Sequence, residues 1–240
     1  MPGRLPTASD FPSHIQLTVT PPPESSPQPS NVLVLLHGLG DTSISFTNLG
    51  KQLSLPETTC ISLQGPTPLP FELGGFHWGD DIQFDQLSGN IELDTGFVKT
   101  SKILKNDIIE ATLIGLCGYD PREILMFGFG QGGMAALAAG ALMTEELGGI
   151  VSIGGPLPSS STAKQSPTPV LVLGGSSNTL ITKSAVAKLK IAFENVEYQK
   201  WGRAGDGMPR NREEMLPIMR FLARRLRSRR GVPEDSVEIG

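Results

Sequence analysis

Short apolar runs recur along the chain, separated by segments that carry polar and charged positions. The run VLVLLHG at 32–38 has almost no polar position, which is typical of a strand covered on both faces. The stretch HIQLTVT at 14–20 instead alternates apolar and polar residues, as an edge or half-buried strand does. We predict strands at 14–20, 32–38, 59–64, 123–129, 149–154, 170–175 and 196–201.

The segments between these runs have the spacing of amphipathic helices. We predict helices at 44–53, at 94–116, at 131–144, in a segment that runs through Lys190, and near 212–227. The buried face of the long helix at 94–116 is expected to hold Phe97, Leu104, Ile108 and Ala111. Pro217 is expected to kink the last helix or to set its start. Strands alternating with helices indicate an α/β protein with one mostly parallel central sheet and helices on both faces.

Composition divides the chain into three parts. Residues 1–30 combine the first strand with the stretch PPPESSPQPSN, whose prolines and serines predict a flexible connection. Residues 31–229 hold all the other predicted elements and form a single domain, and residues 230–240 form a C-terminal tail. Inside the domain, the stretch at 65–81 is rich in proline, glycine and aromatic residues without a period, which predicts an ordered loop.

Charge and cysteine content narrow the partners and the compartment. A formal net charge of −4 gives no electrostatic reason to expect nucleic acid as a partner. Cys60 and Cys117 lie far apart without metal-ligand spacing, so we expect buried thiols in a reducing compartment and a cytoplasmic location. The N-terminal stretch lacks the apolar core of a signal peptide.

One uncharged stretch, at 124–143, is nearly long enough to span a bilayer. It contains five glycines and Gln131, and its strand-forming residues give way to alanines halfway along. A buried strand followed by a buried helix explains that change, so no membrane span is predicted.

The sequence GFGQGG at 128–133 fits two motifs. Gly128, Gly130 and Gly133 match G-x-G-x-x-G, the turn that binds a dinucleotide pyrophosphate. That motif needs a carboxylate about 20 residues on, at the end of the next strand, where this chain has only serine and glycine. The same stretch fits G-x-S-x-G, the nucleophile elbow, with Gly130 in the position of the serine.

Further motifs favour the elbow. LLHGLGD at 35–41, GFGQGG, WGD at 78–80 and GDGMPRNREEM at 205–215 occur in this order. Together they resemble the phospholipase/carboxylesterase family of α/β-hydrolases, to which acyl-protein thioesterases belong. The resemblance spans about 32–225 and implies an α/β-hydrolase domain that cleaves esters or thioesters with a serine, an acid and a histidine.

The three catalytic positions that this resemblance implies carry other residues. Gly130 is at the nucleophile position, and Asn178 stands where the family has the aspartate of a G-x-x-D pattern. Met208, six residues before Glu214, stands at the histidine position. Glycine has no hydroxyl, asparagine cannot neutralise an imidazolium, and methionine transfers no proton. We therefore predict that the fold is kept and the catalytic triad is lost.

The backbone of such a site does not depend on the triad. The resemblance implies that the N–H groups of Leu39 and Gln131 form the oxyanion hole, and that Phe76 and Trp78 line an acyl groove, although packing of the loop onto the sheet explains the two aromatic residues equally well. The residues expected at the pocket are His37, Phe76, His77 and Trp78. A replacement catalytic role for His77 or Asp206 is a less favoured alternative, and the two cysteines are expected in the core because neither has a histidine partner.

The last predicted helix and the residues after it are basic. The cluster consists of Arg220, Arg224, Arg225, Arg227, Arg229 and Arg230. A solvated helix face is the simplest interpretation, and docking to an acidic partner or to phosphates is the alternative.

Three functions follow from the sequence. The favoured one is a non-catalytic member of the family that binds an acyl or ester small molecule or an acylated protein, without cofactor or metal. The second is an active ester or thioester hydrolase with a non-standard or misaligned triad. A dinucleotide-dependent enzyme is disfavoured because the ribose-binding carboxylate is missing.

Overall fold

The computed structural model spans residues 1–240 and describes all of them except 1–2, 25–28, 71–72, 87–88, 162–164 and 229–240. The excluded ranges contain part of the predicted flexible connection, the last two arginines of the basic cluster and the predicted C-terminal tail. Those predictions therefore lie outside the described residues.

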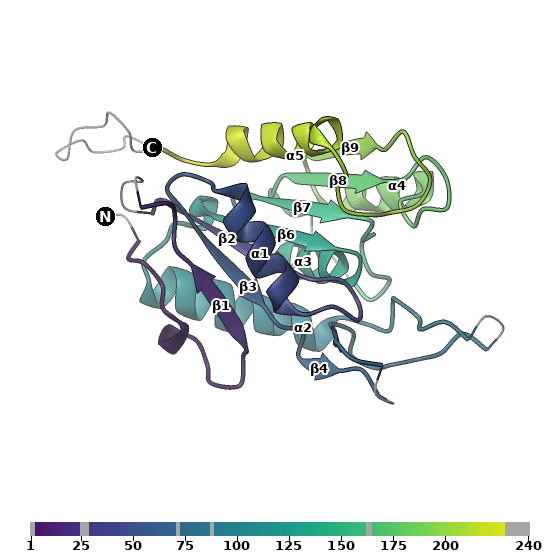
Figure 1. Ribbon diagram of the computed structural model, residues 1–240, viewed down its shortest axis with the longest axis horizontal. Helices are drawn as coiled ribbons and strands as arrows, with labels where there is room; N and C mark the ends of the chain where they lie inside the picture. The colour runs from purple at the N-terminus through teal and green to yellow at the C-terminus, as the bar shows by residue number, and fades with distance from the viewer. Residues whose placement is uncertain (1–2, 25–28, 71–72, 87–88, 162–164, 229–240) are drawn as a thin grey trace.

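Within the described residues, seven strands form one sheet in the order β1-β3-β2-β6-β7-β8-β9 (Figure 1). β1 runs antiparallel to β3, and every other neighbouring pair is parallel. The strands are β1 (Leu17–Thr20), β2 (Asn31–Leu36), β3 (Thr58–Leu63), β6 (Ile124–Phe129), β7 (Gly149–Ile153), β8 (Val170–Gly174) and β9 (Val196–Lys200). The predicted mostly parallel α/β architecture is confirmed.

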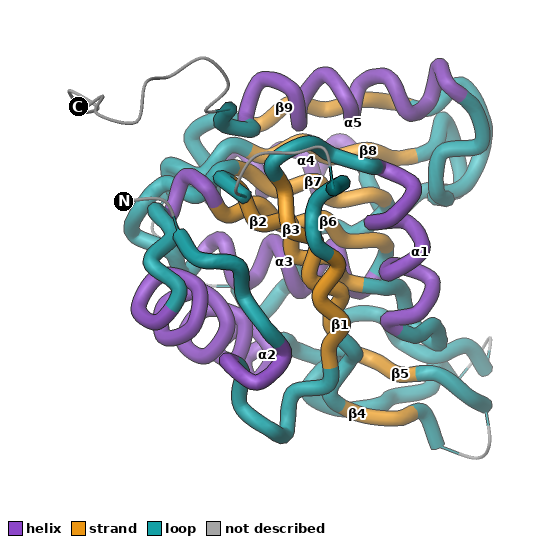
Figure 2. The backbone as a smooth tube through the Cα atoms, turned by 60° about the vertical axis from the view of Figure 1, so that its left-hand side comes forward, coloured by secondary structure: helices purple, strands orange, loops and turns teal. Residues whose placement is uncertain are grey.

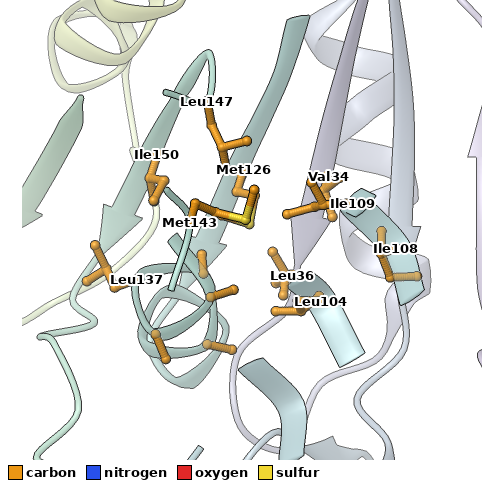
Figure 3. Packing of buried hydrophobic residues seen from close by; sticks show 14 of the residues in the cluster. Val34, Leu36, Leu104, Ile108, Ile109, Met126, Leu137, Met143, Leu147 and Ile150 are labelled. Atoms are coloured by element: carbon orange, nitrogen blue, oxygen red, sulfur yellow. The ribbon is translucent and has the colours of Figure 1, made fainter. Parts of the chain in front are cut away.

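Helices cover both faces of the sheet. Because alternate residues of each strand point to opposite faces, the apolar side chains form two separate core clusters. On β2, Val34 and Leu36 belong to one core cluster, while Leu33 and Leu35 belong to the other. Figure 3 shows the first cluster, where side chains from β2, β6, η2 and α3 meet. The helices on that face are α2 (Val98–Lys102), η2 (Ile103–Leu116), α3 (Gln131–Ala141) and α4 (Lys183–Ala192), and those on the other are α1 (Ser43–Leu53) and α5 (Arg212–Arg225).

The long helix predicted at 94–116 differs from the expectation in its start and in its register. It begins at Val98, because the carboxylate of Asp80 accepts hydrogen bonds from the N–H groups of Val98 and Lys99, both 2.8 Å long. From Ile103 onward it is a π-helix, with more residues per turn than an α-helix. Ala111, expected on the buried face, is consequently exposed, whereas Leu113 is buried.

In the last helix, one of the two alternatives expected for Pro217 is wrong. Asn211 caps α5 by accepting a hydrogen bond from the N–H of Glu214 at 2.9 Å, so the helix begins at Arg212. Pro217 lies inside the helix and does not set its start.

β6 and α3 account for the uncharged stretch at 124–143. Every residue of α3 is buried, which explains why the helix lacks charge on all sides. Among the helices in the described part of the chain, none has both the length and the apolar character needed to cross a bilayer.

The loop predicted at 65–81 contains a small ribbon of its own. Thr67–Pro68 (β4) pairs antiparallel with Phe76–His77 (β5), apart from the main sheet (Figure 2). An isolated antiparallel bridge joins Phe76 to Asp41, so the ribbon extends to the turn that follows β2.

The end of α5 is attached to the start of β2. The side chain of Asn31 donates to the carbonyl of Arg227 at 2.8 Å and accepts from its N–H at 2.8 Å. Ser228 donates to the buried Glu57, just before β3, at 2.9 Å. The C-terminal helix is thereby fixed across the face that contains Leu33 and Leu35.

Candidate functional site

The turn between β6 and α3 has the backbone of a nucleophile elbow. Gly130 has φ 51° and ψ −118°, a conformation that favours glycine, and its N–H donates to the carbonyl of Ile153 at 2.8 Å. A Cβ at Gly132 would lie 2.4 Å from the carbonyl oxygens of Leu36 and His37, so glycine is required there. A Cβ at Gly130 would meet no described atom within 4 Å. The turn therefore leaves open space at the predicted nucleophile position.

The two predicted oxyanion donors lie in the turn after β2 and at the first residue of α3. The N–H groups of Leu39 and Gln131 have no hydrogen-bond partner among the described residues. The side chain of Gln131 is used elsewhere, since its Oε1 accepts from the N–H of Trp78 at 2.8 Å and its Nε2 donates to the carbonyl of Leu93 at 3.1 Å. The Gln131 side chain thus connects the elbow to the segment between β5 and α2, which contains Trp78 and Leu93. The backbone N–H of Gln131 makes none of these contacts and is available to a ligand.

The residues at the predicted acid and histidine positions lie in the loops after β8 and β9. Asn178 is exposed and has φ 46°. Met208 is half-buried, and its side chain packs against the cluster that contains Leu33. Neither side chain makes a hydrogen bond within the described chain, so these positions hold no proton relay.

Asp206 is a residue of this region whose role the sequence did not indicate. Its carboxylate accepts hydrogen bonds from the N–H of Gly175 at 2.8 Å, the hydroxyl of Thr179 at 2.6 Å and the N–H of Leu180 at 2.8 Å. Asp206 therefore fixes the loop after β8, which carries Asn178. These three hydrogen bonds give Asp206 a structural role in the loop, and a catalytic role for it stays a less favoured prediction.

Contacts between the loops bring all of these positions to one edge of the sheet. A Cβ at Gly155, after β7, would lie 2.4 Å from the carbonyl oxygen of Gly130, and one at Gly154 would lie 2.6 Å from the Cβ of Asp206. The loops after β6, β7, β8 and β9 therefore meet at the carboxyl ends of the parallel strands, where open α/β sheets bind ligands.

His37 is a structural histidine. Its Nε2 accepts from the N–H of Gly65 at 2.9 Å, so the proton is on Nδ1, which donates to the carbonyl of Gly38 at 2.7 Å. Burial lowers the pKa of His37 and keeps the ring neutral. Trp78 lies against it, with ring centroids 5.1 Å apart, and its indole N–H donates to the carbonyl of His37 at 2.8 Å. All the polar atoms of His37 are in use, which leaves none for catalysis.

His77 is also buried, but its ring has no partner. Both ring nitrogens lack a hydrogen bond among the described residues, and burial lowers the pKa of the side chain while Asp81 raises it. A catalytic base needs a group that orients it and a nucleophile within hydrogen-bonding reach. The described chain provides neither for His77.

The two cysteines do not supply a displaced nucleophile. Both are free and buried, as predicted. Burial raises the pKa of the Cys60 thiol to about 12 and also raises the pKa of Cys117. Since the thiolate is the reactive form, both side chains are inert at neutral pH.

The structure gives no support to a dinucleotide site at this turn. At the end of β7, where the ribose-binding carboxylate is required, Ser152 is buried and donates to the carbonyl of Gly155 at 2.7 Å. The nearby carboxylate of Asp206 already accepts the three hydrogen bonds from the loop after β8.

Most arginines of the basic cluster that the structure describes form internal ion pairs. Arg224 contacts Glu197, Arg225 contacts Glu146, and Arg227 lies within 4.0 Å of Asp120. These contacts neutralise charge that an acidic partner would need. Docking of such a partner at α5 stays a prediction.

Both the sequence and the fold are similar to those of known hydrolases. The family model for Phospholipase/Carboxylesterase matches residues 22–195. An uncharacterized hydrolase of Schizosaccharomyces pombe is 33% identical over 218 residues, which cover 87% of this chain and 89% of that protein. Acyl-protein thioesterase 1 of Debaryomyces hansenii is 25% identical over 214 residues, covering 80% and 90%. The solved structure of esterase PE8 matches with a TM-score of 0.69 and 22% identity, covering 88% and 99%.

Proposed function

This chain belongs to the phospholipase/carboxylesterase family of α/β-hydrolases, and on that premise we propose that it is a non-catalytic member which binds an acyl, ester or carboxylate group beside Gly130. The observation that carries the proposal is the elbow itself. It keeps the backbone conformation, and the N–H groups of Leu39 and Gln131 have no partner in the described part of the chain, but it has no hydroxyl in the open space at Gly130. A cytoplasmic location is part of the proposal, and the two buried free thiols support it.

The neighbouring side chains support binding without turnover. His37 is fully hydrogen-bonded, Asn178 is exposed, and Met208 is half-buried against a core cluster. In a serine hydrolase that has lost its triad, the oxyanion hole and substrate binding leave about 10³–10⁴-fold acceleration over water, roughly a millionfold below the intact enzyme. Two backbone donors still bind a carbonyl or carboxylate oxygen, because their geometry belongs to the fold.

Binding is tested at one hydrogen-bond donor. Proline is tolerated at the first position of a helix, so Gln131→Pro removes the N–H of residue 131 with little harm to α3. Gln131→Ala is the matched control, because it loses the same side-chain contacts and keeps the N–H. We expect octanoate, measured by calorimetry, to bind the Gln131→Pro variant about tenfold or more weakly than the Gln131→Ala variant. Equal affinity in the two variants contradicts binding at this turn.

Turnover is tested separately. The native chain is expected to leave 4-nitrophenyl acetate and an acyl thioester unhydrolysed and to escape labelling by a fluorophosphonate. The combined variant Gly130→Ser, Asn178→Asp, Met208→His is expected to gain esterase activity, with Gly130→Ala as an inactive control. Efficient turnover by the native chain that persists in Gly130→Ala rejects the non-catalytic proposal and favours a hydrolase with another nucleophile.

A further inference from the structure

A cavity of about 230 Å³ lies away from the elbow. It is lined by residues of the segment at 14–16, the end of β3, the β4–β5 ribbon and the first turns of η2. Gly130, Leu39 and Gln131 are not among its lining residues. Of the four residues expected at the pocket, Phe76 and Trp78 line this cavity, whereas His37 and His77 do not. The cavity is therefore distinct from the space at the nucleophile position.

The lining of the cavity defines the chemistry of its ligand. The floor is apolar and buried, formed by Leu63, Trp78, Leu104 and Ile108. The exposed rim includes the polar side chains of His14 and Gln16. Among the described residues no lysine, arginine, aspartate or glutamate lines it, so a charged ligand would lose its hydration without gaining an ion pair from them. An apolar floor with polar groups at the mouth suits a neutral molecule that has an apolar body and one polar group.

The volume sets the size of that molecule. A cavity of about 150 Å³ holds benzene, whereas drug-sized ligands occupy about 300–1,000 Å³. The present cavity lies between these limits and matches a single substituted ring of about ten heavy atoms.

The wall of the cavity is hydrogen-bonded to the predicted oxyanion turn. Gly65 donates to His37, and Trp78 donates to the carbonyl of His37 through its indole and to Gln131 through its backbone. The hydroxyl of Thr100, another lining residue, donates to the carbonyl of Trp78 at 2.6 Å. A ligand that packs on Trp78 and Gly65 would hold these groups in place.

We propose that this cavity is a second binding site, for a small uncharged amphipathic ring compound, and that its occupancy stabilises the turn that follows β2. The proposal is independent of whether Gly130 binds an acyl group.

Calorimetry of the full chain with 2-phenylethanol tests the site. We expect saturable binding at one site, and at least tenfold weaker binding of phenylacetate. Ile103→Phe, at a half-buried lining position, should fill the cavity and weaken binding at least tenfold. Ile114→Phe is the matched control, since Ile114 is half-buried on the same helix and does not line the cavity. Gln16→Trp, an exposed rim substitution, should reduce binding without any change in the core.

The proposed coupling has its own measurement. Hydrogen exchange at the amides of Gly65 and Trp78 should slow when 2-phenylethanol is bound, and should be unchanged by the ligand in the Ile103→Phe variant. Absence of saturable binding, or binding that both Ile103→Phe and Gln16→Trp leave intact, overturns the site. Binding of phenylacetate at equal affinity overturns the ligand class. Binding without slower exchange at these two amides overturns the coupling to the turn.

Discussion

The turn at 128–132 and the loop at 203–214 both lie at the carboxyl edge of the sheet, but different parts of the chain hold them in shape. In the turn, the backbone determines the conformation, since a Cβ at Gly132 would overlap the carbonyl groups of β2 and the residue after it. In the loop at 203–214, side chains determine the conformation. Asp206 binds the loop after β8, and Arg203 binds Glu214 and the carbonyl of Met208.

The difference explains how the fold is kept although residues 130, 178 and 208 are not a serine, an aspartate and a histidine. The conformation of the elbow comes with the packing of β2, β6 and α3 and does not depend on a side chain at residue 130. The acid and histidine positions lie on loops whose shape depends on other side chains, so residues 178 and 208 can change without loss of the fold.

The largest expected effect tests the backbone side of this comparison. Gly132→Ala should lower the free energy of unfolding by about 3–5 kcal/mol, because the new Cβ would lie 2.4 Å from two backbone oxygens. Gly130→Ala is the control in the same turn and should cost only about 1–3 kcal/mol, from its positive φ alone. Urea denaturation measures both, and equal losses would contradict the distinction between the two glycines.

A smaller effect on stability tests whether side chains hold the loop at 203–214 in shape. Asp206→Ala should cost about 2–3 kcal/mol, because three donors lose a charged acceptor. Asp107→Ala serves as the control, since the Asp107 side chain makes no hydrogen bond or ion pair within the described residues and should change stability little. Hydrogen exchange at Gly175 and Leu180 should become faster in Asp206→Ala only. Unchanged exchange there would show that the loop holds its shape without Asp206.

The buried side chain of His37, in the turn after β2, allows a test through the pH dependence of stability. Burial lowers its pKa in the folded state, so below the unfolded value of about 6.5 the unfolded chain binds more protons. Stability should therefore fall as pH decreases from about 6.5, by at most about 1.4 kcal/mol per pH unit for this group. In His37→Gln the free energy of unfolding should change less steeply with pH. The remaining pH dependence is due to His77, whose pKa is also lowered. His14→Gln, at an exposed position, is the control and should keep the pH dependence of the native chain. Equal pH dependence of stability in the native chain and both variants would show that His37 is not the cause.

The smallest expected effect concerns Glu214 in the loop. Arg203 lowers the pKa of this carboxylate, so the stability it contributes is present above the unfolded value of about 4.3 and is lost as pH falls through the folded value. The melting temperature of Glu214→Gln should be lower than that of the native chain at pH 7, and the gap should close in acid. Glu213→Gln, at the exposed neighbouring position, should show no gap, and a gap that is constant with pH would argue against the ion pair.

The sequence predicted those parts of the fold that depend on burial on two sides. Parallel strands covered on both faces require continuous apolar runs, and these runs located β2, β3, β6, β7 and β8 within a few residues. The register of η2 was not predictable from a period of 3.6 residues, because the helix is wider than that. Ala111 was therefore placed on the buried face, which in fact continues through Leu113.

The candidate site was predictable only where it depends on local sequence. The glycines of the elbow are adjacent in the chain, so their spacing indicated the turn. The role of Asp206 could not be predicted from the sequence. Its partners lie 26 to 31 residues away, and two of the three are backbone N–H groups, which have no signature in the sequence.

The attachment of α5 to Asn31 has a consequence for synthesis on the ribosome. The apolar face of β2 that contains Leu33 and Leu35 is completed by α5, whose last hydrogen bonds reach back 196 residues. At about 5–20 residues per second, translation leaves that face only partly covered for roughly 10–40 seconds. The nascent chain is therefore exposed to aggregation and to chaperone binding until its C-terminal helix has emerged.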